Sequence, residues 1–133
     1  PYYSYTSTGE FETRLIVTNQ LGCSDTVVHT VKVNGLPAAD YNFSTACAGN
    51  PTHFFDHSDP YLAPLVYSGW VISDGNQLIS RVTGATATFT FDSLGIYTVI
   101  HNVSDSNNCT DSITNQVKVT PSPLSVYNVK ENF

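Results

Sequence analysis

Two histidines and two aspartates lie close together between His53 and Asp59, and side chains of these types can bind a metal ion. His53 and His57 would share one face of a helix, but we expect a strand over residues 51–57. On a strand, positions four apart are separated by about 13 Å, at about 3.3 Å per residue, which is too far for one ion. The spacing therefore argues against a zinc site.

No arrangement of residues indicates a catalytic nucleophile. The sequence has no Gly-x-Ser-x-Gly motif, and scattered Ser, His and Asp residues carry no weight without geometry. No pair of carboxylates stands in an obvious cleft either. We therefore predict no catalytic residues and no enzyme activity.

Three cysteines, Cys23, Cys47 and Cys109, are an odd number for a disulfide framework. The chain is rich in Thr, Asn and Ser and poor in Lys, and we expect an oxidising, extracellular setting for it. At least one thiol is then expected to pair with a cysteine outside this sequence.

Composition limits the fold and the partners. The 133 residues are 41% hydrophobic and 12% charged, enough for one core but not for two ordinary domains. Abundant Tyr, Phe, Val and Thr favour an all-β fold. The net charge of −6, with only five Lys and Arg, disfavours nucleic acid and anionic membranes as partners. No apolar run approaches the roughly 18 residues that a membrane span needs, and any targeting segment is expected to lie outside this sequence.

The chain contains an internal repeat with a constant separation of 86 residues. The segment from Gly95 to Val119 repeats the segment from Gly9 to Val33 without a gap. Matching residues include Cys23 with Cys109, and Tyr3 and Tyr5 return as Phe89 and Phe91. The unit is about one small domain long, so we interpret the chain as part of a tandem array.

Alternating apolar and polar residues predict where the strands lie. We expect three strands in residues 1–36, at residues 1–6, 11–17 and 26–33, which would be the C-terminal part of a preceding unit. Residues 37–121 are expected to form one complete unit, and residues 122–133 the first strand of a following one. The strands predicted for the complete unit are 39–44, 51–57, 66–73, 77–83, 86–92, 96–105 and 111–119. Seven short strands at this spacing are typical of an immunoglobulin-like β-sandwich.

Two segments of the complete unit resemble a known family. Trp70-Val-Ile-Ser-Asp74-Gly75 and Gly95-Ile-Tyr97-Thr-Val99 are similar to motifs of the PKD (polycystic kidney disease) domain. Val71, Ile72, Ser73 and Phe89 depart from its pattern. The cysteine motifs around Cys47 and Cys109 resemble PKD-like repeats of large surface and secreted proteins in the Bacteroidetes. The resemblance covers residues 37–121 fully and both flanks in part.

The motif residues also have physical roles that do not depend on the family. We expect Trp70 to lie in the core, and Asp74 and Gly75 to form a tight turn. Tyr97, two residues after Gly95, resembles a tyrosine corner, whose hydroxyl ties a loop to the sandwich. Some PKD domains hold calcium, and Asp56, Asp59 and Asp74 would be the ligands here if they meet at a loop end. The interpretation we favour is that they are ordinary turn aspartates, so no cofactor is expected.

Three Asp-Ser/Thr-aliphatic sequences resemble the O-glycosylation signal of secreted Bacteroidetes proteins, which would place sugar on Thr26, Ser93 and Ser112. Such short patterns also arise by chance. The Asn-x-Ser/Thr sites at Asn42, Asn102 and Asn108 matter only in a eukaryotic host.

Immunoglobulin-like connectivity would place Cys47 in the first loop at one end of the unit and Cys109 in the sixth loop at the other. A disulfide needs Cα atoms within about 7 Å, so a bond between units is one hypothesis and a bond from Cys47 to Cys109 is the other. In the first, Cys47 bonds the counterpart of Cys109 in the following unit, and Cys109 bonds the counterpart of Cys47 in the preceding unit.

Two classes of function remain open. The first is a structural or adhesive segment of a long extracellular protein, serving as stalk, spacer or filament body, whose partners are neighbouring repeats of the same protein. The second is an accessory module of a secreted enzyme, in which exposed aromatics such as Tyr61 and Tyr67 hold a polysaccharide or a protein.

Overall fold

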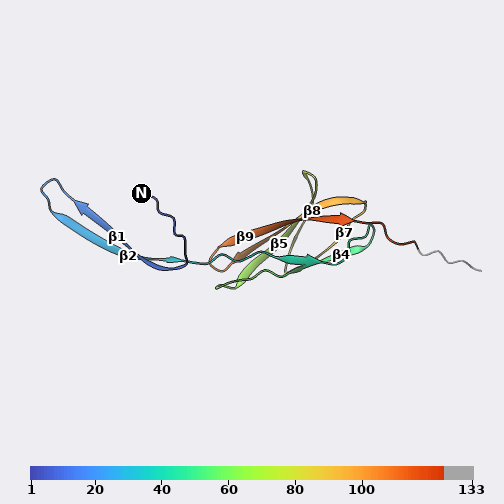
Figure 1. The fold of residues 1–133 in the computed structure, drawn as a ribbon, viewed down its shortest axis with the longest axis horizontal. Coiled ribbons are helices and arrows are strands. Elements are labelled where there is room, and N and C mark those ends of the chain that lie inside the picture. The colour runs from blue at the N-terminus through green and yellow to red at the C-terminus, as the bar shows by residue number, and fades with distance from the viewer. Residues whose placement is uncertain (125–133) are drawn as a thin grey trace, which may run out of the picture.

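The computed structural model describes residues 1–124, and these contain nine strands and no helix. Figure 1 shows a hairpin at the N-terminal end, extending away from a larger body that contains the other strands. The strand predicted for residues 122–133 falls mainly on residues outside the described part of the chain. No helix of the described residues is long and apolar enough to cross a membrane.

The hairpin consists of β1 (Gly9–Thr18) and β2 (Ser24–Val33), which pair with each other and with no other strand of the described residues. The larger body is a sandwich of two antiparallel sheets. One sheet has the order β3-β4-β7 and the other has the order β6-β5-β8-β9. The strands are β3 (Tyr41–Phe43), β4 (Pro51–Asp56), β5 (Leu65–Asp74), β6 (Gln77–Thr83), β7 (Thr86–Thr90), β8 (Gly95–Asp105) and β9 (Thr110–Val119).

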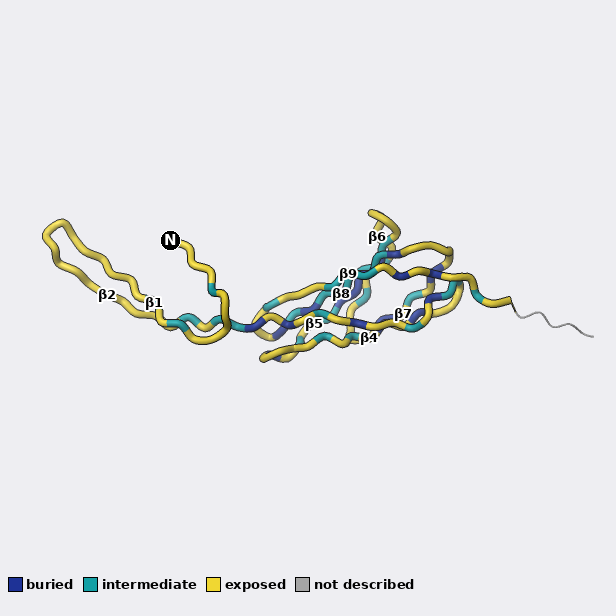
Figure 2. The backbone as a smooth tube through the Cα atoms, in the orientation of Figure 1, coloured by how far each residue is buried: buried dark blue, intermediate teal, exposed yellow. Residues whose placement is uncertain are grey.

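These seven strands confirm the predicted all-β, immunoglobulin-like sandwich. Their residues alternate between the core and solvent as the sequence pattern indicates. In β8, for example, every second residue from Tyr97 to Asp105 is buried. Figure 2 shows buried backbone concentrated in the sandwich, whereas the hairpin is exposed along almost its whole length.

The core lies between the two sheets and is built around Trp70, which is 1% exposed. The indole N–H of Trp70 donates a hydrogen bond to the carbonyl oxygen of Gly84 at 2.8 Å, so the buried polar atom has a partner. Phe54 packs on the indole with ring centroids 5.7 Å apart, and Tyr41 meets it edge-on at 5.2 Å. The expectation that Trp70 belongs to the core, rather than to a ligand platform, agrees with this burial.

The strand predicted for residues 1–6 is absent, and this prediction was wrong. The corresponding residues of the sandwich belong to β7 and the loop that follows it, and β7 forms hydrogen bonds with β4. No strand of the described residues offers the same pairing to residues 1–6. A strand pattern without a pairing partner does not form a ladder.

The aromatic packing of this segment nevertheless repeats that of the sandwich. Tyr3 and Tyr5 have ring centroids 4.9 Å apart at 74°, and their counterparts Phe89 and Phe91 are 4.9 Å apart at 73°. Tyr5 also contacts Phe11 at 4.7 Å, as Phe91 contacts Tyr97 at 4.6 Å.

The β1–β2 hairpin repeats the β8–β9 hairpin in register as well as in sequence. Gly9 pairs with Val33 and Thr18 with Ser24, and the pairs 86 residues later are Gly95 with Val119 and Ser104 with Thr110. The turns also match. The Asn19 side chain accepts hydrogen bonds from the backbone of Leu21 and Cys23. Its counterpart Asp105 accepts them from Asn107 and Cys109.

Burial is where the two hairpins differ. Val103 is 1% exposed and His101 is 0% exposed in β8, but their counterparts in β1, Val17 and Leu15, are 56% and 59% exposed. The inner face of β8 is covered by the opposite sheet of the sandwich, whereas the same face of β1 has no cover among the described residues.

Candidate functional site

The structure does not gather the candidate calcium ligands Asp56, Asp59 and Asp74 into one cluster. Asp56 accepts a hydrogen bond from the backbone N–H of Ser58 at 2.8 Å, and Asp59 accepts one from Tyr61 at 2.8 Å. Asp74 lies at the end of β5, beside the two-residue turn into β6. No group of three or more His, Cys, Asp or Glu side chains within residues 1–124 is arranged to hold a metal ion. Asp56 and Asp59 therefore act as turn residues in this fold.

Asp56 has a second contact that the sequence does not indicate. Its Oδ1 lies 3.1 Å from Nε2 of His101, and the two side chains are 9% and 0% exposed. The other ring nitrogen, Nδ1, lies 3.3 Å from the carbonyl oxygen of Gly69. Both ring nitrogens of His101 therefore face oxygen atoms in the interior of the sandwich. The contact between Nε2 and Oδ1 is close, but its geometry is not that of a hydrogen bond.

Two further features hold this pair. The imidazole stacks on the Trp70 indole, with ring centroids 3.9 Å apart at 23°. Burial by itself would raise the pKa of the Asp56 carboxyl, but hydrogen bonds from Ser58 and Ser68 and the contact with the His101 ring outweigh it and lower the pKa from the usual 3.8.

Tyr41 is a further buried polar side chain near this pair. Burial raises the pKa of Tyr41, whose hydroxyl donates a hydrogen bond to the carbonyl oxygen of Val99 at 3.2 Å. The side chains of Tyr41, Asp56 and His101 are enclosed, so they stabilise the fold and do not form an open site.

The other motif residues also serve the scaffold. The hydroxyl of Tyr97 donates a hydrogen bond to the carbonyl oxygen of Ser93 at 3.1 Å, which ties the β7–β8 loop to the sandwich. Gly75 has φ 56°, a left-handed value that glycine adopts without strain, in the turn after Asp74. Gly95 begins β8 and pairs with Val119.

The segment that connects the hairpin to the sandwich is held by ring packing and by backbone hydrogen bonds. Gly35 and Pro37 are buried, and the Tyr61 ring lies over Gly35 so closely that a Cβ at this position would overlap it. Tyr61 itself has φ 56°, an uncommon value for a residue other than glycine. Ala38 and Asp59 exchange two backbone hydrogen bonds of 2.9 Å. We call residues 34–39 together with Tyr61 the junction.

A side chain of the sandwich secures the same connection. The backbone N–H of Ala39 donates a hydrogen bond of 2.8 Å to Oδ2 of Asp111, at the start of β9. The chain therefore leaves the hairpin through a segment that is held by hydrogen bonds and by ring packing, and not through a free linker.

The cysteines lie at opposite ends of the sandwich. Cys47 forms a parallel β-bridge with Thr120, directly after the end of β9, whereas Cys109 directly precedes Thr110 at its start. A ten-residue strand is about 34 Å long, so Cys47 and Cys109 of one unit are too far apart to form a disulfide. A Cys47–Cys109 bond within one unit therefore does not fit this fold. All three thiols are free in the structure.

The three predicted glycosylation residues, Thr26, Ser93 and Ser112, are all exposed. Ser112 also lines a cavity of about 480 Å³ on the four-stranded sheet, together with Tyr67, Asn102, Val103, Ser104, Thr110 and Asp111. Tyr67 is 48% exposed, and its ring lies over Gly69, where a Cβ would overlap the ring and hydroxyl. An aromatic ring held across a sheet and flanked by polar groups is able to stack against a flat apolar ligand surface.

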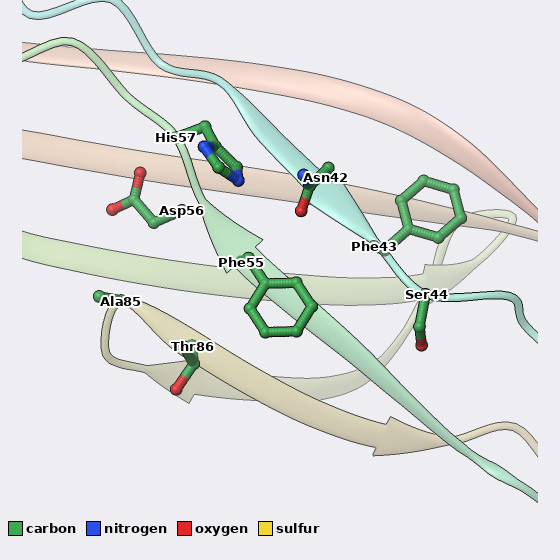
Figure 3. A pocket seen from close by; sticks show the side chains of 8 residues that line it. All are labelled: Asn42, Phe43, Ser44, Phe55, Asp56, His57, Ala85 and Thr86. Carbon is green, nitrogen blue, oxygen red and sulfur yellow. The ribbon is translucent and has the colours of Figure 1, made fainter.

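A larger cavity of about 650 Å³ lies on the three-stranded sheet (Figure 3). The Phe55 ring, 43% exposed, lies on the open side of β4 between Asn42 of β3 and Thr86 of β7, its direct neighbours across the sheet. The cavity is open, and its lining carries one carboxylate, that of Asp56, which is committed to His101. The remaining polar groups of the lining are the Asn42 amide, the Ser44 and Thr86 hydroxyls and the His57 ring.

Sequence reasoning missed the Asp56–His101 pair, the packing of Tyr61 on Gly35 and the packing of Tyr67 on Gly69. The last of these had a signal, because a glycine two residues after an exposed aromatic in a strand leaves room for the ring. The other two join residues that are far apart in the sequence and carry no local pattern.

Comparison with protein-family models and with curated proteins gives no match. Solved structures do match. The PKD1 domain of Vibrio anguillarum Epp is 23% identical with a TM-score of 0.57, and the match covers 68% of this chain and all of that one. The PKD1 domain of the Vibrio cholerae metalloprotease PrtV is 20% identical with a TM-score of 0.56, covering 64% of this chain and 98% of that one.

A third structure comes from work on the promiscuous specificity of carbohydrate-binding modules of the β-sandwich superfamily. It is 25% identical with a TM-score of 0.60, and the match covers 68% of this chain but only 36% of that one. The chain therefore has an immunoglobulin-like β-sandwich fold similar to that of PKD domains.

Proposed function

We propose that the chain is a non-catalytic segment of an extracellular tandem array of PKD-like units, which serves as a stalk, spacer or filament body. The observation that carries the proposal is the repeated hairpin. β1–β2 has the register and the turn of β8–β9, but its core-forming residues are exposed. It is therefore the C-terminal hairpin of a preceding unit, and residues 37–121 are one complete unit.

The junction supports a mechanical role. A spacer keeps two ends apart only if its units do not swing freely, and swing depends on the segment between them. Here that segment is buried at Gly35 and Pro37, paired through Ala38 and bonded through Ala39. Such an array transmits force along its length as a series of sandwiches with restrained joints.

Electron microscopy of the native, full-length protein tests this function. We expect unbranched rods or filaments with an axial repeat of one sandwich, roughly 35–40 Å for ten-residue strands and their turns. Discrete compact particles, or beads that scatter around flexible connections, would contradict a spacer role.

One observation favours a second function, an accessory module that binds glycans for an attached enzyme. The hydroxyl end of the Tyr67 ring lies over Gly69, and the ring lines a cavity with Asn102, Asp111 and Ser112. A structure from work on carbohydrate-binding modules has a similar fold. Aromatic stacking combined with hydroxyl and amide groups is a common means of sugar recognition. Tyr61 is the other exposed aromatic suggested by the sequence, and its ring packs on Gly35 within the junction.

Affinity electrophoresis in gels that contain soluble polysaccharides tests this second function. A glycan-binding module is retarded, and Tyr67→Ala loses the retardation while Phe55→Ala, on the opposite sheet, keeps it. Equal mobility of all three proteins with every polysaccharide would remove the binding function.

A further inference from the structure

We propose that successive units of the array are joined by a ladder of disulfide bonds, in which Cys47 of each unit bonds the counterpart of Cys109 in the unit that follows. This inference rests on the tandem array proposed above and names the covalent partner at each junction. Cys23, as the counterpart of Cys109 in the preceding unit, has its partner one unit further back.

The positions of Cys47 and Cys109 leave each without a partner in its own unit. Cys47 lies beside Thr120 through a parallel bridge, with its Sγ 4.0 Å from the Thr120 hydroxyl. Cys109 lies at the other end of β9, about one strand length away. Both side chains are partly exposed, so each thiol is accessible to another segment.

The two ends are complementary when units follow one another. Thr120 corresponds to Asn34 under the separation of 86 residues, so the counterpart of Cys47 in the preceding unit lies beside Asn34. Asn34 and Asn107 line the same cavity where the hairpin meets the sandwich, and Cys109 is two residues beyond Asn107. One thiol from each unit therefore approaches the same junction.

The turn that carries Cys109 contains a second group without a partner. Asp105 is 1% exposed, and its Oδ1 accepts hydrogen bonds from the backbone of Asn107 and Cys109 at 2.8 and 2.9 Å. Its Oδ2 is buried and has no hydrogen-bond partner within residues 1–124. Buried acceptors are normally satisfied, and an internal water is a common partner for such an atom.

The bond forms by thiol–disulfide exchange. The two thiols lose two protons and two electrons as one S–S bond forms, and a disulfide oxidant of the secretory pathway or oxidised glutathione accepts the electrons and becomes two thiols. Each such bond lies beside a junction already held by hydrogen bonds, so it resists separation of the units under load without changing their arrangement.

The test uses the full chain with a second copy of residues 37–122 inserted after Ser122 and with Cys23→Ser. The protein is refolded in a mixture of reduced and oxidised glutathione, isolated as a monomer and mapped by proteolysis without reduction. We expect a linked pair of Cys47 and Cys109 peptides. The link is lost when Cys47→Ser is placed in the first copy and is kept when the same substitution is placed in the second.

A link that survives both single substitutions would assign the bond to the individual units, because each copy would then form its own Cys47–Cys109 pair, and free thiols in every monomer would exclude any bond. Either result overturns the ladder. Small-angle X-ray scattering of the same protein tests the tandem array independently of the disulfide ladder. If the array is correct, the maximum dimension exceeds that of the original chain by about one strand length, roughly 35 Å, with or without the disulfide.

Discussion

The buried pair of Asp56 and His101 links the two sheets of the sandwich, because Asp56 ends β4 and His101 lies in β8. Both side chains are enclosed, and removing one of them would leave buried polar atoms of the other without their neighbour. The lowered pKa of Asp56 shows that the folded state favours its carboxylate. Its contribution to stability is therefore present above the pKa of the unfolded chain and is lost as the pH falls through the lower folded value.

Asp56→Asn is accordingly expected to reduce the free energy of unfolding at pH 7 by about 1.5–3 kcal/mol, the range for hydrogen bonds to charged groups. The deficit relative to the original chain should shrink below about pH 4, where the carboxylate begins to be protonated in the unfolded state. Urea unfolding monitored by Trp70 fluorescence at pH 7 and pH 3 measures both values.

Asp74→Asn is the matched control, because Asp74 is exposed and lies in a turn. An Asp56→Asn protein as stable as this control at pH 7 would show that the buried pair contributes nothing.

Single residues were predictable where their role is local. The position of Trp70 in an alternating strand indicates burial, and the spacing of Gly95 and Tyr97 indicates a tyrosine corner, which the hydrogen bond to Ser93 agrees with. The Asp56–His101 pair was not predictable, because the fold joins two strands that are 45 positions apart and neither residue has a local pattern. The same limit applies to Tyr61 and Gly35.

At the scale of elements, the two equivalent hairpins allow a direct test of burial. Val103 in β8 and Val17 in β1 occupy the same repeat position, but they are 1% and 56% exposed. Val103→Ala is expected to destabilise the sandwich by about 2–3 kcal/mol through lost apolar burial and the remaining cavity. Val17→Ala should change stability by less than about 0.5 kcal/mol.

Denaturant unfolding of both variants gives these values. A similar loss for the two substitutions would mean that the hairpin is already packed against another segment in the isolated chain.

The junction is the second element that a substitution can test. Gly35→Ala places a Cβ where the Tyr61 ring lies, so the ring must move and the hairpin should swing more freely. Spin labels on Cys23 and on Asp92→Cys, with Cys47→Ser and Cys109→Ser, report this as a distance distribution. We expect a narrow distribution in the original chain, a broad one for Gly35→Ala, and a narrow one for Leu36→Ala, since Leu36 is 66% exposed. A narrow distribution for Gly35→Ala would refute a ring-packed junction.

Elements were predictable from alternation and from turn residues, which is why the seven strands of residues 37–121 occur where the sequence indicates them. The expected strand at residues 1–6 did not form because a strand needs a neighbour, and the pattern of one segment does not report whether that neighbour is present. The sequence predicted an immunoglobulin-like fold, and the strand connectivity of that fold places Cys47 and Cys109 at opposite ends of the unit. The structure has this arrangement.

At the scale of the whole molecule, the proposed tandem array requires that β1–β2 belong to a sandwich whose other strands come from an earlier part of the array. The exposed face of Leu15, Val17 and Val27 is then the inner face of a core. The counterparts of those residues are His101, Val103 and Ile113, of which the first two are fully buried and the third packs against the core. In such an array, the other strands of the same unit cover these faces.

The most direct test supplies the missing part of the unit. Pro1 is the counterpart of Ala87, so the part of a unit that comes before it corresponds to residues 37–86. A second copy of residues 37–86 is therefore joined to the N-terminus. That copy carries Asp56→Asn, because Leu15 stands where His101 would face it. Hydrogen exchange of the β1 amides is then measured by NMR. We predict that the β1 amides pointing away from β2 exchange at least about a hundredfold more slowly in the extended protein. They gain a partner strand equivalent to β5. The same extension carrying Trp70→Asp should lose this protection, whereas unchanged exchange with the intact extension would contradict the tandem-unit account.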